Sequence, residues 1–308
     1  MIPALIFTGY LKRQALFDDY RLFNYQPSTT ITKLADDTTM QTAARRLFFV
    51  YHPEIDDKTT FNSHCREDEQ TIVLGCYVEG QGIYIFNVTD TRLEGIEQVT
   101  AAHETLHAAY ERLSSKDRNK VDAMTAAAFN QLADQSLKDR IELYRKKDPS
   151  SVPNELHSIL GTEAATLPSD LEQYYKRYFK DRSKVVAYAE NYAAAFTERK
   201  NQIDSYDQQL NDLKNQIDSL QATLAAQLNQ LNSLKATMDE LKGSGQISAY
   251  NKQVPAYNSL VYVYNTNINK LSVLISQYND IVPKRNDLAT EEQTLYDAID
   301  SRLVPAKK

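Results

Sequence analysis

Two histidines four residues apart, His103 and His107, enclose Glu104 and are the residues of this 308-residue chain best suited to chemistry. On an α-helix, positions i and i+4 lie about 40° apart around the axis, so both imidazoles can hold one zinc ion. Glu104 would then lie beside the ion and accept a proton from a water that the ion activates. Two histidines and a water leave one position of a tetrahedral ion to fill, so a third protein ligand must come from elsewhere.

The surrounding residues predict the helix that this spacing requires. Within 94–113 one apolar stripe has helical spacing, with His103 and His107 at its edges, so both histidines are expected to face inward. The stripe consists of Ile96, Val99, Ala102, Leu106, Ala109 and Leu113. The competing interpretation is a helix with two polar residues at the edge of its core. The pattern favours a metal site.

Upstream, the chain predicts a small sheet. The strand-like segments 71–78 and 82–88 flank a Gly-rich turn and indicate a β-hairpin that leads directly into the motif helix. The segment 47–51 predicts a further strand, stopped by a proline at position 53. Short helices are expected at 29–35 and 39–46.

Downstream, the pattern is helical. Helices are expected at 115–135, 137–146 and 154–167, the last of these bounded by prolines. A capping box at Ser169 and Glu172 predicts the start of a long helix that continues through Tyr192.

A small sheet followed by an H-E-x-x-H helix resembles the zinc metallopeptidases of the zincin group. The group that continues as H-E-x-x-H-x-x-G-x-x-H is excluded, because no third histidine follows His107 at that spacing. The resemblance is therefore to gluzincins, which take a glutamate from a later helix. It implies one Zn²⁺ per chain, Glu104 as general base and a peptide or protein substrate. By the same resemblance, the strand 82–88 would lie beside the cleft and pair with extended substrate.

Two glutamates compete for the third metal position. Glu163 is favoured, because the small Gly161 beside it allows a close approach to the motif helix. Glu155 is the alternative, because the segment 154–158 resembles the Asn-Glu-x-x-Ser-Asp signature of thermolysin-like enzymes. That match is incomplete, since Ile159 takes the place of the final aspartate. Eight residues separate the two along one helix, so only one can reach the ion.

A hydrolytic site also needs a donor for the developing oxyanion. His157 and Tyr110 are the candidates, and Tyr174 and Tyr175 compete with them. For His157 a purely structural position fits equally well.

The C-terminal third predicts a coiled coil. Apolar residues recur at alternating spacings of three and four over 203–241, with the polar Gln227 taking one place, and again over 250–282. Glycines at 243 and 245 separate the two runs. The prediction is an antiparallel helical hairpin within one chain. The alternative is pairing between chains, which would make a dimer.

Cysteine content, charge and the N-terminus bear on the compartment. Cys65 and Cys76, eleven residues apart, predict a disulfide and thus an extracellular or cell-surface location. The net charge of −6 without a basic cluster argues against nucleic acid as a partner. The apolar segment 1–13 is expected to be a short arm or the remnant of a membrane anchor.

Together these features predict an α+β fold with three parts: an arm at 1–13, a zincin-like metallopeptidase domain at 14–195 and a coiled-coil hairpin at 196–308. The leading hypothesis is a zinc-dependent metallopeptidase. One alternative is a non-catalytic binding or structural protein, in which the hairpin contacts a protein partner and the zincin-like domain is a scaffold. Another is a zinc-dependent hydrolase of cell-wall peptides, which would use the same residues.

Overall fold

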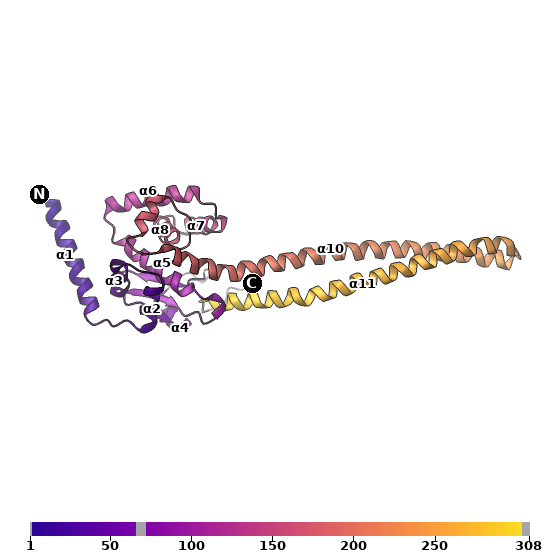
Figure 1. The fold of residues 1–308 in the computed structure, drawn as a ribbon, viewed down its shortest axis with the longest axis horizontal. Coiled ribbons are helices and arrows are strands. Elements are labelled where there is room, and N and C mark those ends of the chain that lie inside the picture. Colours follow the sequence, from indigo (N-terminus) through magenta and orange to yellow (C-terminus); the bar gives the residue numbers. More distant parts are fainter. Residues whose placement is uncertain (1, 66–71, 304–308) are drawn as a thin grey trace. The chain divides into compact units, whose positions relative to one another are not determined.

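The structure is a computed structural model that describes residues 2–65 and 72–303. It is mostly helical, with one small sheet of three strands and a pair of long helices (Figure 1). The chain divides into two compact units. Unit 2 is Thr197–Thr294, and unit 1 comprises the described residues on either side of it. The predicted boundary at 195/196 lies next to this one, but residues from Leu295 onward return to unit 1, where Leu295 packs with Leu93.

Unit 1 begins with α1 (Ile2–Phe23), so the segment 1–13 is not an element of its own. Ionic contacts attach the C-terminal half of α1 to the rest of the unit. The guanidinium of Arg112 donates to both carboxylate oxygens of Asp18, at 2.8 and 2.9 Å, and Arg21 Nε donates to the carbonyl of Val50 at 2.9 Å. Within the described residues, no helix is both long enough and apolar enough to cross a membrane.

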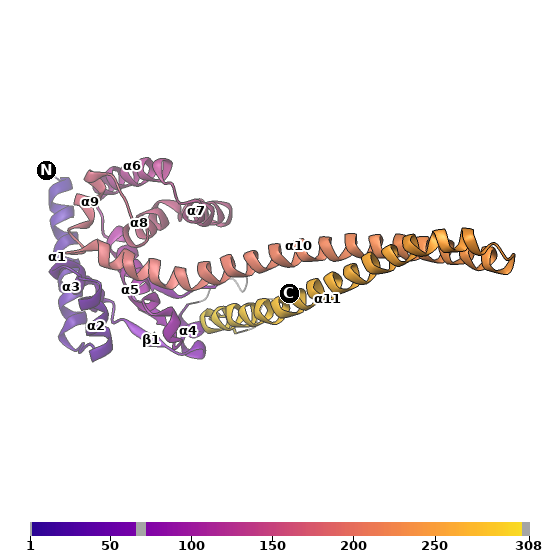
Figure 2. The same ribbon diagram turned by 45° about the vertical axis from the view of Figure 1, so that its right-hand side comes forward.

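Two short helices follow, α2 (Thr29–Asp37) and α3 (Thr42–Val50). The predicted strand at 47–51 is wrong, because these residues form the C-terminal half of α3. Ala44, Leu47 and Phe48 recur at helical spacing and are buried, so a helix places them all in the core, whereas a strand would separate them onto two faces. Figure 2 shows α1, α2 and α3 at one end of the unit, where α1 contacts α3 and α2 contacts the motif helix.

The sheet consists of β1 (Glu54–Asp56), β2 (Gly75–Val78) and β3 (Gly82–Phe86) in the order β1-β3-β2. β2 and β3 form the predicted antiparallel hairpin, whereas β1 pairs in parallel with β3 and was not predicted. The short helix α4 (Lys58–His64) connects β1 toward β2. Because β3 is the central strand, both of its edges are already paired. It cannot be the strand that adds an extended substrate.

The disulfide is formed as predicted. Cys65 at the end of α4 bonds to Cys76 in β2, with the two Cα atoms 5.9 Å apart. It therefore ties α4 to the outer strand of the sheet.

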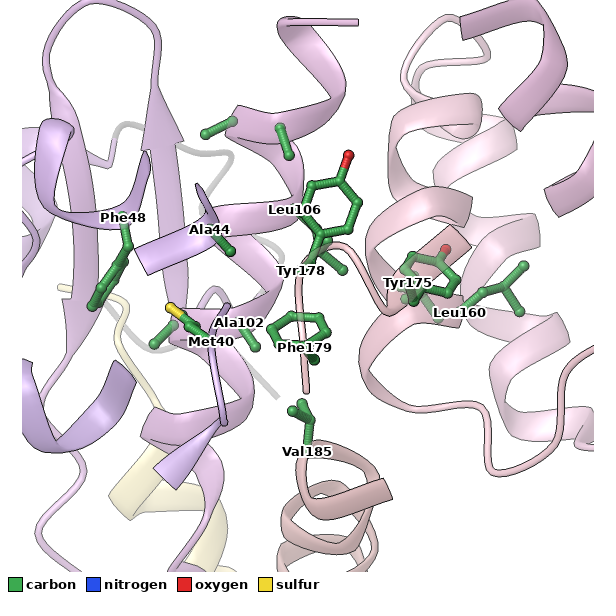
Figure 3. Packing of buried hydrophobic residues seen from close by; sticks show 14 of the residues in the cluster. Met40, Ala44, Phe48, Ala102, Leu106, Leu160, Tyr175, Tyr178, Phe179 and Val185 are labelled. Carbon is green, nitrogen blue, oxygen red and sulfur yellow. The ribbon is translucent and has the colours of Figure 1, made fainter. Parts of the chain in front are cut away.

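The motif helix is α5 (Ile96–Glu111), preceded by a 3₁₀ turn η1 (Thr91–Leu93). The predicted helices after it are α6 (Ser115–Gln131), α7 (Gln135–Lys147) and α8 (Val152–Thr162). Both α6 and α8 end several residues before their predicted limits of 135 and 167. α5 runs through the middle of the core and packs along α8, α3 and the sheet. Figure 3 shows its residues Ala102 and Leu106 between Phe48 of α3 and Leu160 of α8.

The predicted continuous helix from Ser169 onward is broken. α9 (Ser169–Tyr175) ends, and α10 (Arg182–Gly243) begins seven residues later. The intervening segment pairs with the residues between α2 and α3: the amide of Gln41 donates to the carbonyl of Tyr178 at 2.7 Å, and that of Lys180 to Thr39 at 2.8 Å. These bonds use backbone groups that a continuous helix would need. The predicted capping box is also absent, since Glu172 pairs with Arg182.

In unit 2, α10 and α11 (Ile247–Ile299) form the predicted hairpin within one chain (Figures 1 and 2). Gly245 lies in the turn with a φ of 75°, a conformation that favours glycine. The seam buries apolar residues of α10, and its polar position is satisfied, because Asn267 Nδ2 donates to Gln227 Oε1 at 3.1 Å. The buried members are Ile203, Leu224, Leu231 and Met238.

Candidate metal centre

Two helices bring three metal-ligating side chains together. His103 and His107 lie one turn apart on α5, and Glu155 lies in the first turn of α8. The two Nε2 atoms are 3.0 Å apart. Each lies 3.8 Å from an oxygen of the Glu155 carboxylate. We refer to these three residues as the histidine cluster.

The separations in the histidine cluster fit a single zinc ion. A tetrahedral zinc with bonds of about 2.0–2.1 Å holds its ligand atoms about 3.3 Å apart. The measured separations of 3.0 and 3.8 Å lie on either side of that value, so small side-chain rotations suffice to close the site. Two histidines and one glutamate are also a ligand set of catalytic zinc sites, which leave the fourth position open.

A glycine allows the two helices to approach this closely. A Cβ atom added to Gly161 of α8 would lie 2.4 Å from Leu106 Cδ1 of α5 and 2.7 Å from a ring carbon of Tyr175. Gly161 therefore sets the spacing between α5 and α8, and the same helix carries Glu155 at its start. The inference from sequence that Gly161 permits a close approach is correct.

The glutamate chosen on the basis of that inference, Glu163, does not lie with the two histidines. Glu163 is outside the histidine cluster, at the C-cap of α8, where its carboxylate accepts a hydrogen bond from Arg140 of α7. Eight residues of helix separate it from Glu155, which amounts to about 12 Å along the axis. Among the described residues, the carboxylate that lies with the two histidines is therefore that of Glu155, the alternative, and not that of Glu163.

The two imidazoles of the histidine cluster are in their unprotonated form. Burial lowers the pKa of His103 well below its usual value, and His107 and Arg140 lower it further. Burial also lowers the pKa of His107 to about 4, against a smaller opposing effect of Asn154. Both imidazoles are therefore neutral at pH 7 and keep the lone pairs that a metal needs.

The glutamate of the motif is held against the sheet. Glu104 is buried, with 6% of its surface exposed. A Cβ added to Gly75 of β2 would lie 3.0 Å from Glu104 Oε1 and 2.3 Å from Thr100 Cγ2. Glycine at position 75 is therefore what lets β2 pass over this part of α5. β2 is an edge strand, and it contacts α5 as the central strand β3 does.

The two oxyanion donors expected from sequence lie in the core instead. His157 is fully buried, and its Nε2 lies 2.9 Å from the hydroxyl of Tyr174. Tyr175, also fully buried, donates its hydroxyl to the carbonyl of His157 at 2.7 Å. Tyr110 is 5% exposed and donates to Asp122 at 2.7 Å. The hydroxyl of Tyr110 is thus engaged by Asp122, and His157 is hydrogen-bonded to Tyr174 and Tyr175 within the core.

Two residues near the motif helix, Gly75 and Arg140, were not identified from the sequence. Gly75 gave no signal, because a glycine in a strand has no chemistry of its own. Arg140 lies in a predicted helix and was given no role from the sequence. In the structure it pairs with Glu163, interacts with Tyr192 and contributes to the low pKa of His103. It is thus a fixed positive charge near the histidine cluster.

Comparison with protein-family models, with curated proteins and with solved structures finds no match for this chain.

Proposed function

We propose that this protein is a zinc-dependent peptide hydrolase of the gluzincin type. The observation that carries the proposal is the meeting of three ligand atoms from α5 and α8, at separations of 3.0 and 3.8 Å. Glu104 follows His103 on α5 and is buried, and in this proposal its carboxylate is the general base. This combination of ligands and base is what hydrolysis by an activated water requires.

His103, His107 and Glu155 would hold the zinc ion. A zinc ion bound there supplies the Lewis acidity that activates a water at neutral pH and polarises the scissile carbonyl. Glu104 accepts the proton that the attacking water loses and then delivers it to the leaving amine. The peptide C–N bond breaks, and the water supplies the new carboxylate oxygen and the amine hydrogen.

Substrate positioning and charge stabilisation would come from β2 and Arg140. β2 forms the outer edge of the sheet beside α5, the position from which an extended peptide can add a strand. Arg140, whose side chain is 37% exposed, supplies a positive charge near His103. A guanidinium there can stabilise negative charge on the carbonyl oxygen as the bond breaks.

The Cys65–Cys76 pairing supports a location outside the reducing cytosol, because such bonds persist in oxidising compartments. In that setting, the unit 2 hairpin would contact a protein or cell-surface partner. Mass spectrometry of protein isolated from its native compartment tests the location. Two free thiols would contradict it.

Metal analysis combined with a peptide-cleavage screen tests the function. We expect one zinc per chain in protein purified without chelator. Glu104→Gln keeps the shape of the side chain but removes the proton acceptor, so zinc should remain while turnover falls by roughly 10² to 10⁴. His107→Ala should lose both zinc and turnover.

Glu94→Gln is the matched control, because Glu94 is an exposed glutamate just before α5. It should leave zinc and turnover unchanged. Zinc near zero in the wild-type protein would refute the metal centre. Zinc present with equal turnover in the wild type and Glu104→Gln would refute the catalytic role of Glu104.

A further inference from the structure

A second group of ligating side chains lies on the other side of the sheet's central strand from β2. Glu54 and Asp56 are two residues apart in β1, so their side chains point to the same face of the strand. His64 is the last residue of α4. One ligand atom from each of the three lies within 4.8 Å of the other two. We refer to these residues as the carboxylate cluster.

The buried member of the cluster is Asp56. Its exposed fraction is 6%, and its Oδ2 atom has no hydrogen-bond partner among the described residues. A buried carboxylate oxygen without a partner costs free energy, which a bound cation would offset. Neither a lysine nor an arginine is paired with Asp56 among the described residues.

The histidine of the cluster is held in place from two sides. The His64 ring is stacked on Tyr84 of β3, with the centroids 3.9 Å apart and the planes 3° apart. Tyr84 is the register partner of Glu54 in the parallel pair, so both side chains are on the same face of the sheet. The neighbouring Cys65 is bonded to Cys76 of β2. The contacts of α4 with β3 and β2 therefore hold His64 near the two carboxylates of β1.

We propose that Glu54, Asp56 and His64 bind a divalent transition-metal ion, Zn²⁺ or Mn²⁺, which fastens α4 to β1. The mixed ligand set carries this choice, because imidazole suits zinc and carboxylates suit manganese, whereas Ca²⁺ and Mg²⁺ prefer oxygen alone. The ion joins α4 to β1 as the disulfide joins α4 to β2.

The two carboxylates of the cluster are accessible to solvent. Glu54 and Asp56 line an open pocket of about 590 Å³, whose wall also includes the polar Ser28 and Asn87 but not His64. Water can therefore reach the carboxylate side of the cluster.

Titration of Mn²⁺ in the full-length His103→Ala/His107→Ala variant tests this site, because the histidine cluster can no longer contribute. Free Mn²⁺ is followed by electron paramagnetic resonance, and Zn²⁺ is then added as a competitor. We expect one saturable Mn²⁺ per chain. Adding Glu54→Gln and Asp56→Asn to the variant should abolish it. Glu79→Gln is the matched control, since Glu79 is exposed on the turn between β2 and β3 and should leave binding unchanged.

His64→Phe provides a second, independent variant, because phenylalanine can keep the stacking on Tyr84 but cannot ligate. It should also abolish binding, with thermal melting confirming that the protein is folded. Absence of saturable Mn²⁺ and Zn²⁺ binding in the His103→Ala/His107→Ala variant would overturn the proposal. Binding that survives both His64→Phe and the double carboxylate variant would overturn it as well.

Discussion

The histidine cluster and the carboxylate cluster are built on the same plan from different secondary structure. In the first, a helix supplies two ligands at i and i+4, and a second helix supplies the third. In the second, a strand supplies two ligands at i and i+2, and a helix end supplies the third. Each spacing brings two side chains to one face of its element. Only the i, i+4 pair was found from the sequence. The i, i+2 pair was not, because β1 was not predicted, and the third residue of each cluster depends on the tertiary fold.

The two clusters differ in how exposed their members are. In the histidine cluster the side chains of His103, His107 and Glu155 are only 17%, 13% and 14% exposed, between helices held by the close approach of Gly161 to Leu106. In the carboxylate cluster Glu54 is exposed. A preformed site loses less conformational entropy on binding. We therefore expect the histidine cluster to bind zinc more tightly than the carboxylate cluster does.

The largest expected effect is on zinc affinity, and it comes from replacing each of the two candidate glutamates of α8 by alanine in turn. Glu155→Ala should lose tightly bound zinc, because it removes one of three protein ligands. Glu163→Ala should retain it, because Glu163 pairs with Arg140 and not with the histidines. Competition with a chromophoric chelator measures both affinities. Zinc retained in Glu155→Ala and lost in Glu163→Ala would restore the ligand first expected from sequence.

The next largest effect concerns Glu104, the proposed general base. In Gly75→Ala, the new methyl group would lie 2.3 Å from Thr100 Cγ2 and 3.0 Å from Glu104 Oε1, so Glu104 must shift. Misplacement by about 1 Å can cost roughly 10²-fold in rate, so we expect turnover to fall by ten- to a hundredfold while zinc is retained. Steady-state kinetics with zinc analysis measures both.

The control for Gly75→Ala is its combination with Thr100→Ser. Serine removes the Cγ2 atom but keeps the hydroxyl that donates to the carbonyl of Ile96. The double variant should recover part of the lost turnover. If Gly75→Ala alone has full activity, the packing of β2 on Glu104 does not matter for catalysis.

These cases show which parts of the molecule could be predicted from the sequence. The motif helix and the hairpin of unit 2 were predicted because their patterns are periodic over many residues. The segment 47–51 was misread because its five apolar residues have no period of their own. Only the continuation of the spacing from Ala44 identifies the helix α3.

The third ligand could not be predicted for a different reason. Glu155 and Glu163 lie on the same helix, and both are compatible with a nearby metal. The choice depends on Arg140, which approaches Glu163 from α7, 23 residues away in sequence. The break between α9 and α10 is similar, because it depends on backbone bonds to residues 39 and 41. Such long-range partners leave no local trace in the sequence.

The third prediction separates the clusters through the disulfide. Cys65 adjoins His64, whereas neither cysteine adjoins a ligand of the histidine cluster. Replacing both cysteines by serine opens a loop with a sequence separation of 11 residues. The free energy of unfolding should fall by about 3 kcal/mol in the chain-entropy model. Chemical denaturation measures this loss.

In the same double-serine variant, Mn²⁺ binding at the carboxylate cluster should weaken, while the zinc content of the histidine cluster should stay constant. Equal loss at both clusters would mean that the disulfide stabilises the whole unit and does not specifically position His64.

The smallest effect tests what orients the histidine of the carboxylate cluster. Tyr84→Leu keeps an apolar side chain in the core but removes the ring stacked on His64. An aromatic pair contributes about 0.5–1.5 kcal/mol, so Mn²⁺ affinity should fall roughly two- to tenfold. The titration is done in the His103→Ala/His107→Ala background. Tyr84→Phe keeps the ring and should bind as the parent does. If Leu and Phe at this position give equal affinities, stacking does not orient His64, and the disulfide alone holds it toward the carboxylates.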